Sequence, residues 1–218
     1  MALSPDLTAD RDRALALTPV SRETLDRLDR FVAELLSWRQ RMNLIAPSTV
    51  PILWTRHVAD SLQLLALAPQ VKTWADLGSG AGFPGLVLAC ALADTPGVTV
   101  HLVESNGKKA SFLREAARVT GVPAVIHAVR IVDFVNNQTG GIEVVTARAL
   151  APLPELLSAT YPLLKNGTVG LFPKGQDVEA ELTAATKCWN IQSSLEPSLT
   201  DPRARIVRIT GIGRKPQS

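Results

Sequence analysis

The feature that most constrains this chain is a glycine-rich turn between an apolar run and a helix-forming run. Residues 71–77 are largely apolar, and residues 86–93 favour a helix. A strand, a tight glycine turn and a helix in this order open a nucleotide-binding α/β unit. Glycine allows a sharp turn and lets a ligand approach the backbone closely. The glycines of the turn are Gly78, Gly80 and Gly82.

The spacing of these glycines indicates which ligand the turn accepts. A dinucleotide site requires a third glycine three residues after the second, and Phe83 occupies that position. The pattern is instead D-x-G-x-G-x-G, which begins at Asp76. We expect S-adenosylmethionine rather than NAD. The Asp76 carboxylate is expected to face the methionine part of this cofactor, and the alternative is an acid that caps the turn or a helix dipole.

A second acidic residue stands where a ribose is recognised in such units. Residues 98–103 read as a strand, and Glu104 follows it about 20 residues after the glycine turn. A carboxylate at this position accepts both ribose hydroxyls of an adenosine. NAD and S-adenosylmethionine both contain that ribose, so Glu104 identifies a cofactor site without separating the two cofactors.

Strands and helices alternate through the rest of the chain. This alternation predicts an α/β fold, a mostly parallel doubly wound sheet with an antiparallel member at one edge. The expected strands cover 71–77, 98–103, 124–129, 142–147, 168–172 and 204–209, and the expected helices after the turn cover 86–93, 108–119, 153–164 and 178–188.

The part of the chain before the first strand is helical in pattern. Residues 1–20 are polar and interrupted by prolines, and we expect a flexible tail. Apolar residues at three- and four-residue steps predict a helix from Ser21 to about residue 43, and a second helix over 51–67. The sequence therefore predicts an N-terminal helical extension over 21–70 and a core domain over 71–218.

Composition narrows the class of protein. The chain has 218 residues, a formal net charge of +3 and a pI of about 9.1, which suit a nucleic-acid partner. Cys90 and Cys188 lie far apart, and no cluster of His, Cys and acids suggests a metal site. The N-terminus has no signal-peptide pattern, and charges or prolines interrupt the apolar runs. We expect a cytoplasmic protein without membrane segments.

Several basic residues lie where ligands bind to such sheets. Arg148 follows the fourth strand and is expected to hold a carboxylate or phosphate, with a surface arginine as the alternative. Lys174 follows the fifth strand, where it either contacts phosphate or forms part of a turn. Lys108 and Lys109 open the helix after Glu104.

His57 and Asp60 are three residues apart on the expected helix and share a face. This pairing is compatible with a general base, and also with an anchor between helix and core. No nucleophile motif accompanies the pair, so a hydrolase is disfavoured.

Taken together, these residues resemble the RsmG (GidB) family, bacterial 16S ribosomal RNA guanine-N7 methyltransferases, from about residue 31 to 209. The R-H-x-x-D-S element at 56–61, the F-P-G ending of the glycine motif and the A-R-A element at 147–149 are more specific than the glycines alone. Further matches are Asn43-Leu44, the segment from Glu104 to Leu113, and Lys174-Gly175.

The resemblance implies a Rossmann-like class I methyltransferase core that uses S-adenosylmethionine. Carried over by position, the cofactor contacts are Gly78, Phe83, the backbone of Ile131-Val132, and Arg148. Members often carry an acid at the position of Val132, whose side chain cannot accept a hydrogen bond from adenine. The expected RNA-binding residues are Arg56, Lys108, Lys109, Arg148 and Lys174.

The implied chemistry requires no acid or base from the protein. Guanine N7 carries an in-plane lone pair and no proton, so alignment with the methyl group is the main requirement. We therefore expect no catalytic acid or base, no metal, and 16S ribosomal RNA or the small ribosomal subunit as partner. The alternatives are a methyltransferase for another RNA site, a small molecule or a protein, a NAD-dependent oxidoreductase, and a non-catalytic RNA-binding module.

Overall fold

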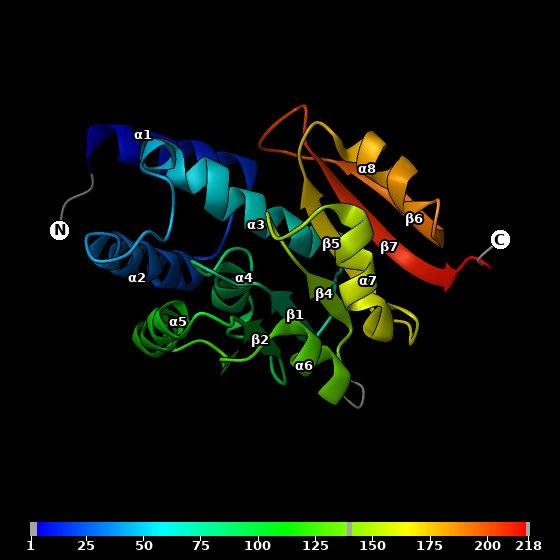
Figure 1. Ribbon diagram of the computed structural model, residues 1–218. Coiled ribbons are helices and arrows are strands. Elements are labelled where there is room, and N and C mark those ends of the chain that lie inside the picture. The colour runs from blue at the N-terminus through cyan, green and yellow to red at the C-terminus, as the bar shows by residue number, and fades with distance from the viewer. Residues whose placement is uncertain (1–3, 139–140, 217–218) are drawn as a thin grey trace.

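The computed structural model describes residues 4–138 and 141–216, and it contains a seven-stranded sheet with helices on both faces (Figure 1). The strand order is β3-β2-β1-β4-β5-β7-β6. The strands are β1 (Thr73–Leu77), β2 (Thr99–Val103), β3 (Ala124–His127), β4 (Val144–Thr146), β5 (Val169–Lys174), β6 (Trp189–Pro197) and β7 (Arg205–Arg214).

The sheet is parallel from β3 to β5, and the C-terminal hairpin β6–β7 adds two antiparallel strands at one edge. The mostly parallel sheet and its antiparallel edge confirm the predicted fold class. Strand order reverses direction between β1 and β4, and ligands of such sheets bind beside this point, at the carboxyl ends of the strands. The glycine turn follows β1, and Arg148 follows β4, so both lie at this edge.

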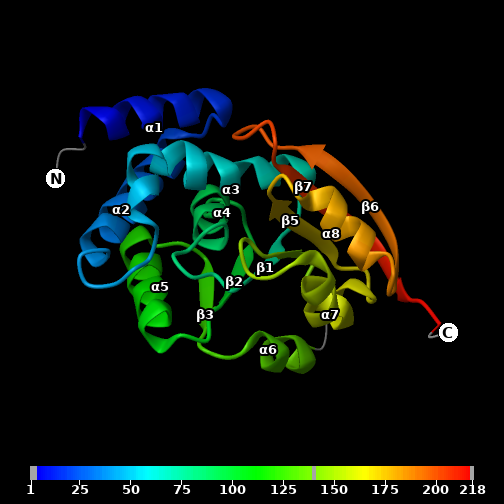
Figure 2. The ribbon, with the colours of Figure 1, turned by 45° about the horizontal axis from the view of Figure 1, so that its top comes forward.

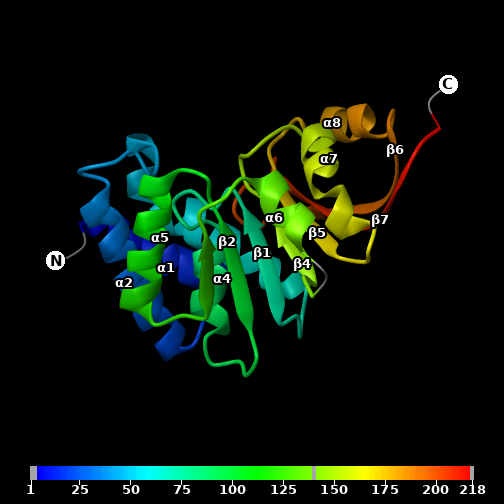
Figure 3. The ribbon, with the colours of Figure 1, turned by 60° about the horizontal axis from the view of Figure 1, so that its bottom comes forward.

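Helices cover the two faces separately (Figures 2 and 3). One face packs against α4 (Gly85–Leu92) and α5 (Gly107–Thr120). The other face packs against α6 (Ile131–Asn137), α7 (Leu153–Leu164) and α8 (Val178–Ala185). Neighbouring strand residues alternate between the two cores, as Trp74 and Ala75 do, because strand side chains point to opposite faces.

The N-terminal extension lies on the α4–α5 side of the sheet (Figure 2). Its helix α2 (Arg22–Trp38) begins where predicted, with the Ser21 hydroxyl accepting from Thr24 N. It ends at Trp38, before residue 43. The second expected helix is a run of short turns: η1 (Pro47–Ile52), η2 (Trp54–Ala59), α3 (Asp60–Leu62) and η3 (Gln63–Leu67).

The expected flexible tail is wrong for residues 5–17, which form helix α1 (Pro5–Leu17); residues 1–3 lie outside the described part of the chain. Ser4 caps this helix. The buried Asp10 carboxylate accepts hydrogen bonds from the backbone N–H groups of Trp54 and Thr55, at 2.8 and 3.1 Å. These donors begin η2 and would otherwise lack partners, so α1 is fixed by the helix that it caps.

Candidate active site

The glycine turn is shaped by three residues in left-handed backbone conformation. The φ angles of Gly78, Gly80 and Gly82 are 71°, 54° and 89°. The N–H groups of Gly78 and Ser79 both donate to the Val103 carbonyl, which ties the turn to the end of β2. A Cβ placed on Gly80 would meet only the Gly78 carbonyl, at 3.6 Å. The turn therefore leaves open space above Gly80, as a ligand cradle requires.

Glu104 lies beside this turn, as predicted. Its Oε2 accepts from Gly80 N at 2.9 Å, and its Oε1 accepts from Asn106 N at 2.7 Å. Each carboxylate oxygen has a second lone pair, so both can still accept a hydroxyl proton. The residues after β3 continue this edge with exposed apolar side chains, Val129 at 40% and Val132 at 55% exposure. This arrangement suits an adenosine, because the carboxylate can accept from the ribose hydroxyls and the apolar surface can pack against the adenine.

Asp76 is buried at the end of β1 and both of its carboxylate oxygens accept hydrogen bonds within the protein, so its expected contact with the cofactor's methionine part stays a prediction. The residue is 1% exposed. Its two oxygens accept from Gly85 N and from the Thr146 hydroxyl, each at 3.1 Å. Burial raises the pKa of this carboxyl to about 6, against the lowering effect of its hydrogen bonds. Asp76 thus joins β1 to the start of α4 and to β4, which is the turn-capping alternative.

Phe83, at the third-glycine position of a dinucleotide motif, is the base of a compact cluster. The His57 ring stacks on Phe83 with centroids 4.9 Å apart, and the Arg148 guanidinium carbon lies 5.4 Å from the Phe83 centroid. Phe31 of α2 packs on the other side, 5.3 Å away. The cluster joins the extension to both loops at the carboxyl edge. Phe83 itself is buried, and the side chains of Arg148 and His57 pack on its ring.

The hydrogen bonds of His57 fix its tautomer. Arg148 Nη2 lies 2.8 Å from His57 Nδ1, and a guanidinium only donates, so Nδ1 accepts. The ring proton is then on Nε2, 3.1 Å from the Thr49 hydroxyl oxygen. Burial and the charges of Arg148 and Arg56 lower the His57 pKa to about 3. His57 is therefore the anchor considered above, and its lone pair is not available to remove a proton.

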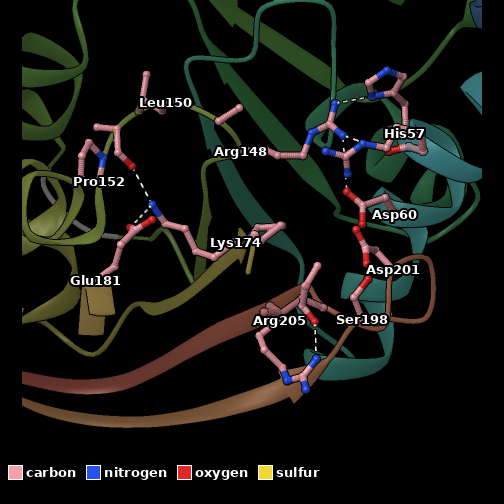
Figure 4. Close-up of a pocket in the computed structure, with 17 residues that line it drawn as sticks. His57, Asp60, Arg148, Leu150, Pro152, Lys174, Glu181, Ser198, Asp201 and Arg205 are labelled. Atoms are coloured by element: carbon pink, nitrogen blue, oxygen red, sulfur yellow. Dashed lines mark hydrogen bonds and ion pairs between the residues drawn. The ribbon is translucent and has the colours of Figure 1, made fainter. Parts of the chain in front are cut away.

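A pocket of about 480 Å³ opens next to this cluster, between the extension, the β4–α7 loop and the β6–β7 loop (Figure 4). Arg148 and Asp60 lie on one wall, and Lys174 and Glu181 on the other. Arg56 also lines the pocket and is exposed. Its turn, η2, is a single turn of π-helix, a widened form that is frequent at functional sites.

The structure separates the other predicted RNA-binding lysines. Lys174 lines the pocket, but its ammonium donates to the Ala151 carbonyl at 2.6 Å and pairs with Glu181 at 2.8 Å. Its side chain is only 10% exposed, so Lys174 fixes the β4–α7 loop, as in the turn-lysine alternative. Lys108 and Lys109 begin α5 on the β2 side and do not line this pocket.

Sequence reasoning missed the residues that the two loops supply. Leu150 packs on Gly78, where an added Cβ would lie 2.7 Å from its Cδ1. Ser198, Asp201 and Arg205 reach the pocket from the C-terminal hairpin. No motif marks these positions. The one available signal was the charged run at 201–205 before the last predicted strand.

The fold and this edge define a class I S-adenosylmethionine-dependent methyltransferase. A family model described as rRNA small subunit methyltransferase G matches residues 24–205, and the chain belongs to this family. It therefore uses S-adenosylmethionine. The described residues contain no helix that is long and apolar enough to cross a membrane. That part of the chain also contains no group of three or more His, Cys, Asp or Glu residues suited to a metal.

Relatives of this family are similar over nearly the whole chain. A protein named ribosomal RNA small subunit methyltransferase G from Bradyrhizobium sp. strain BTAi1 is 60% identical over 208 residues, 95% of this chain and 94% of its own. One of the same name from Nitrobacter hamburgensis is 60% identical over 214 residues, 98% of this chain and 82% of its own.

Solved structures support the fold at low sequence identity. An O-methyltransferase from Bacillus cereus in complex with SAH has a TM-score of 0.61 at 12% identity, and the match covers 94% of this chain and 98% of that one. A putative O-methyltransferase from Klebsiella pneumoniae has a TM-score of 0.59 at 12% identity, with 94% and 96% covered.

Proposed function

We propose that this protein transfers a methyl group from S-adenosylmethionine to N7 of a guanine in 16S ribosomal RNA. The proposal rests on a pocket beside the glycine turn that is lined by arginines and whose histidine is not available as a base. Arg56 and Arg148 line it, and His57 has its lone pair bonded to Arg148. The names of the relatives support a small-subunit ribosomal RNA substrate. A ribosomal substrate also favours action in the cytoplasm.

The cofactor is proposed to lie along the carboxyl edge. At this edge the backbone of Gly78, Gly80 and Gly82 would lie against the cofactor. The Glu104 carboxylate would accept from the ribose hydroxyls, and the apolar surface at Ile131 and Val132 would contact the adenine. The open space above Gly80 fits this placement. When bound, the cofactor supplies an electrophilic methyl group on a sulfonium.

The chain's own residues would act by binding and orientation. Guanine N7 attacks with a lone pair and has no proton to lose, so the site requires no base. The Phe83–His57–Arg148 cluster lies where the cofactor edge meets the pocket, and its stacking and hydrogen bonds hold its three side chains in place. Leu150 lies over Gly78 and would exclude water from this side. Holding both reactants in line supplies most of the rate enhancement in such a reaction.

RNA is proposed to approach over the mouth of the pocket. Arg56 is exposed there, and we expect it to contact a phosphate. Its substitution by alanine should weaken RNA binding and reduce the salt dependence of that binding by about one phosphate contact. The base targeted at N7 has to be unstacked to enter the pocket, which favours an RNA loop or a folded subunit over a regular helix.

The test is methyl transfer from labelled S-adenosylmethionine to 16S ribosomal RNA, as free RNA and as small subunits. The methylated base is then mapped, and N7-methylguanine is identified by mass spectrometry. Label in N7-methylguanine at one position supports the proposal. Label on an exocyclic amine or a ribose would overturn the N7 assignment, and label on ribosomal protein alone would overturn the RNA substrate.

A further inference from the structure

The Asp60 carboxylate connects three parts of the chain that are distant in sequence. It is 4% exposed. Its Oδ2 lies 3.4 Å from Nη1 of Arg148, which belongs to the β4–α7 loop. Its Oδ1 accepts from Gln63 Nε2 at 2.9 Å and from the Thr200 hydroxyl at 2.8 Å. The carboxylate that pairs with Arg148 is thus also hydrogen-bonded to the β6–β7 loop, through Thr200.

The β6–β7 loop is itself fixed to the extension. Gln63 Oε1 accepts from Leu199 N at 2.8 Å, and Gln63 Nε2 lies 3.3 Å from the Ser198 hydroxyl. Ser198 in turn accepts from Thr200 N at 3.2 Å. Thr200 therefore has a defined position, from which its hydroxyl reaches Asp60.

Three hydrogen bonds hold the Arg148 guanidinium. It donates to Asp60, to His57 and to the Arg56 carbonyl at 3.2 Å. A guanidinium has five N–H groups, so these bonds leave two donors for a ligand in the pocket. Its side chain is 15% exposed, so the free donors lie at a restricted opening.

This restraint matters for methylation at N7. The Hoogsteen edge of guanine presents two acceptors, N7 and O6, and an unrestrained arginine binds both at once. Such a pair would occupy the N7 lone pair, which is the nucleophile. An arginine in this pocket assists the reaction only if it donates to O6 and leaves N7 free.

We propose that Thr200 and Asp60 are positioning residues that hold Arg148 so that it donates to guanine O6 and not to N7. This inference rests on the proposed function. It gives the C-terminal hairpin a role in the reaction, because the hydroxyl of Thr200 fixes the acid that orients Arg148.

Thr200→Val tests the inference, since valine keeps the shape and removes the hydroxyl. The turnover number with ribosomal RNA should fall about tenfold or more, the scale of one hydrogen bond to a charged group. The affinity for RNA should stay unchanged or increase, because a released Arg148 binds the base in an unproductive way. Thr200→Ser keeps the hydroxyl and should restore turnover. Thr210→Val, on β7 away from the pocket, is the matched control.

The split between turnover and affinity distinguishes positioning from mere support. In the wild type, the Arg148 side-chain N–H signals should be resolved by NMR, and Thr200→Val should broaden them. Wild-type turnover in Thr200→Val would overturn the inference. A parallel loss of RNA affinity, turnover and melting temperature would also overturn it, since that pattern means a structural role. Absence of N7 methylation by the wild type would instead overturn the proposed function.

Discussion

Arg148 donates to His57 Nδ1 over 2.8 Å, so the histidine nearest the pocket is neutral and has no free lone pair. The guanidinium charge opposes protonation of the ring, and burial opposes it further. This relationship accounts for a site that aligns its reactants without moving a proton.

Because His57 cannot act as a base, the reaction rate should not depend on pH near neutrality. Single-turnover methyl transfer should not change between about pH 6.5 and 9, because a titrating histidine base would show itself near its ordinary pKa of about 6.5. His57→Gln should lower the rate at all pH values by a similar factor. A limb near neutrality that disappears in His57→Gln would make His57 an acid–base participant.

The same pKa shift predicts a change in stability with pH. Unfolded His57 binds a proton below about pH 6.5, whereas folded His57 stays neutral down to about 3. The unfolded state therefore binds more protons in this window, so the free energy of unfolding declines as the pH falls from 6.5 toward 3. The slope should be smaller in His57→Gln, measured by urea denaturation. Equal slopes in both proteins would contradict a neutral, buried His57.

The pKa of Asp76 is shifted so that its effect on stability changes with pH in the opposite direction. Its folded pKa of about 6 lies above the ordinary value of 3.8, so the folded state binds more protons between these values. The contribution of Asp76 to stability is present at pH 4 and declines as the pH rises through 6. Asparagine can accept from Gly85 N and donate to Thr146.

Asp76→Asn should consequently gain stability relative to the wild type between pH 4 and 7, on the order of 1–3 kcal/mol. Asp133→Asn, at an exposed position of α6, is the control and should show no such trend. A constant difference between Asp76→Asn and the wild type across this range would contradict the raised pKa.

A side chain added at Gly85 should be destabilising because it clashes with its neighbours, and not because of the backbone conformation. A Cβ there would lie 2.7 Å from both Asp76 Cβ and Oδ2, and would also meet Leu102. Gly85→Ala should destabilise the protein by about 1–3 kcal/mol, as overpacking of a filled core does. Gly107 has no atom within 4 Å of its added Cβ, so Gly107→Ala should be neutral or stabilising by up to about 1 kcal/mol. Similar denaturation midpoints for both variants would refute this packing argument.

Glu104 carries the prediction for cofactor affinity. Glu104→Ala should weaken S-adenosylmethionine by roughly 1.5–3 kcal/mol, about 10- to 100-fold, because the ribose loses a charged acceptor. Turnover at saturating cofactor should fall less than affinity. Glu115→Ala, on the exposed surface of α5, serves as the calorimetric control. Unchanged affinity with reduced turnover would assign Glu104 to the reaction instead.

The sequence predicted the parts of the site that depend on local pattern. The glycine turn, Glu104 and Arg148 all follow predicted strands, and parallel strands bring their carboxyl ends to one edge. The mostly parallel sheet and its antiparallel edge also followed from the alternation of elements, but the order of the strands and strand β6 were not predicted. Each of the predicted features depends on residues that are close together in the sequence, so local patterns were sufficient to predict them.

Contacts between distant segments could not be predicted in this way. Thr200 lies 140 residues after Asp60, and nothing near it marks a partner. Helix α1 was missed because its order depends on Asp10 and the start of η2, 44 residues later. The hydrogen-bond partners of Asp76 were not predicted, because only the fold shows that Gly85 and Thr146 donate to its oxygens. In each case hydrogen bonds between residues distant in sequence decided the outcome.

Replacing the target guanine of the RNA by 7-deazaguanine tests directly whether N7 is the nucleophile. This base keeps O6 and the Watson–Crick edge but has a C–H group in place of N7. We expect that RNA binding persists and that no methyl group is transferred to the replaced base. Methyl transfer to it at the rate seen with guanine would contradict N7 as the nucleophile, and with it the alignment mechanism proposed for this site.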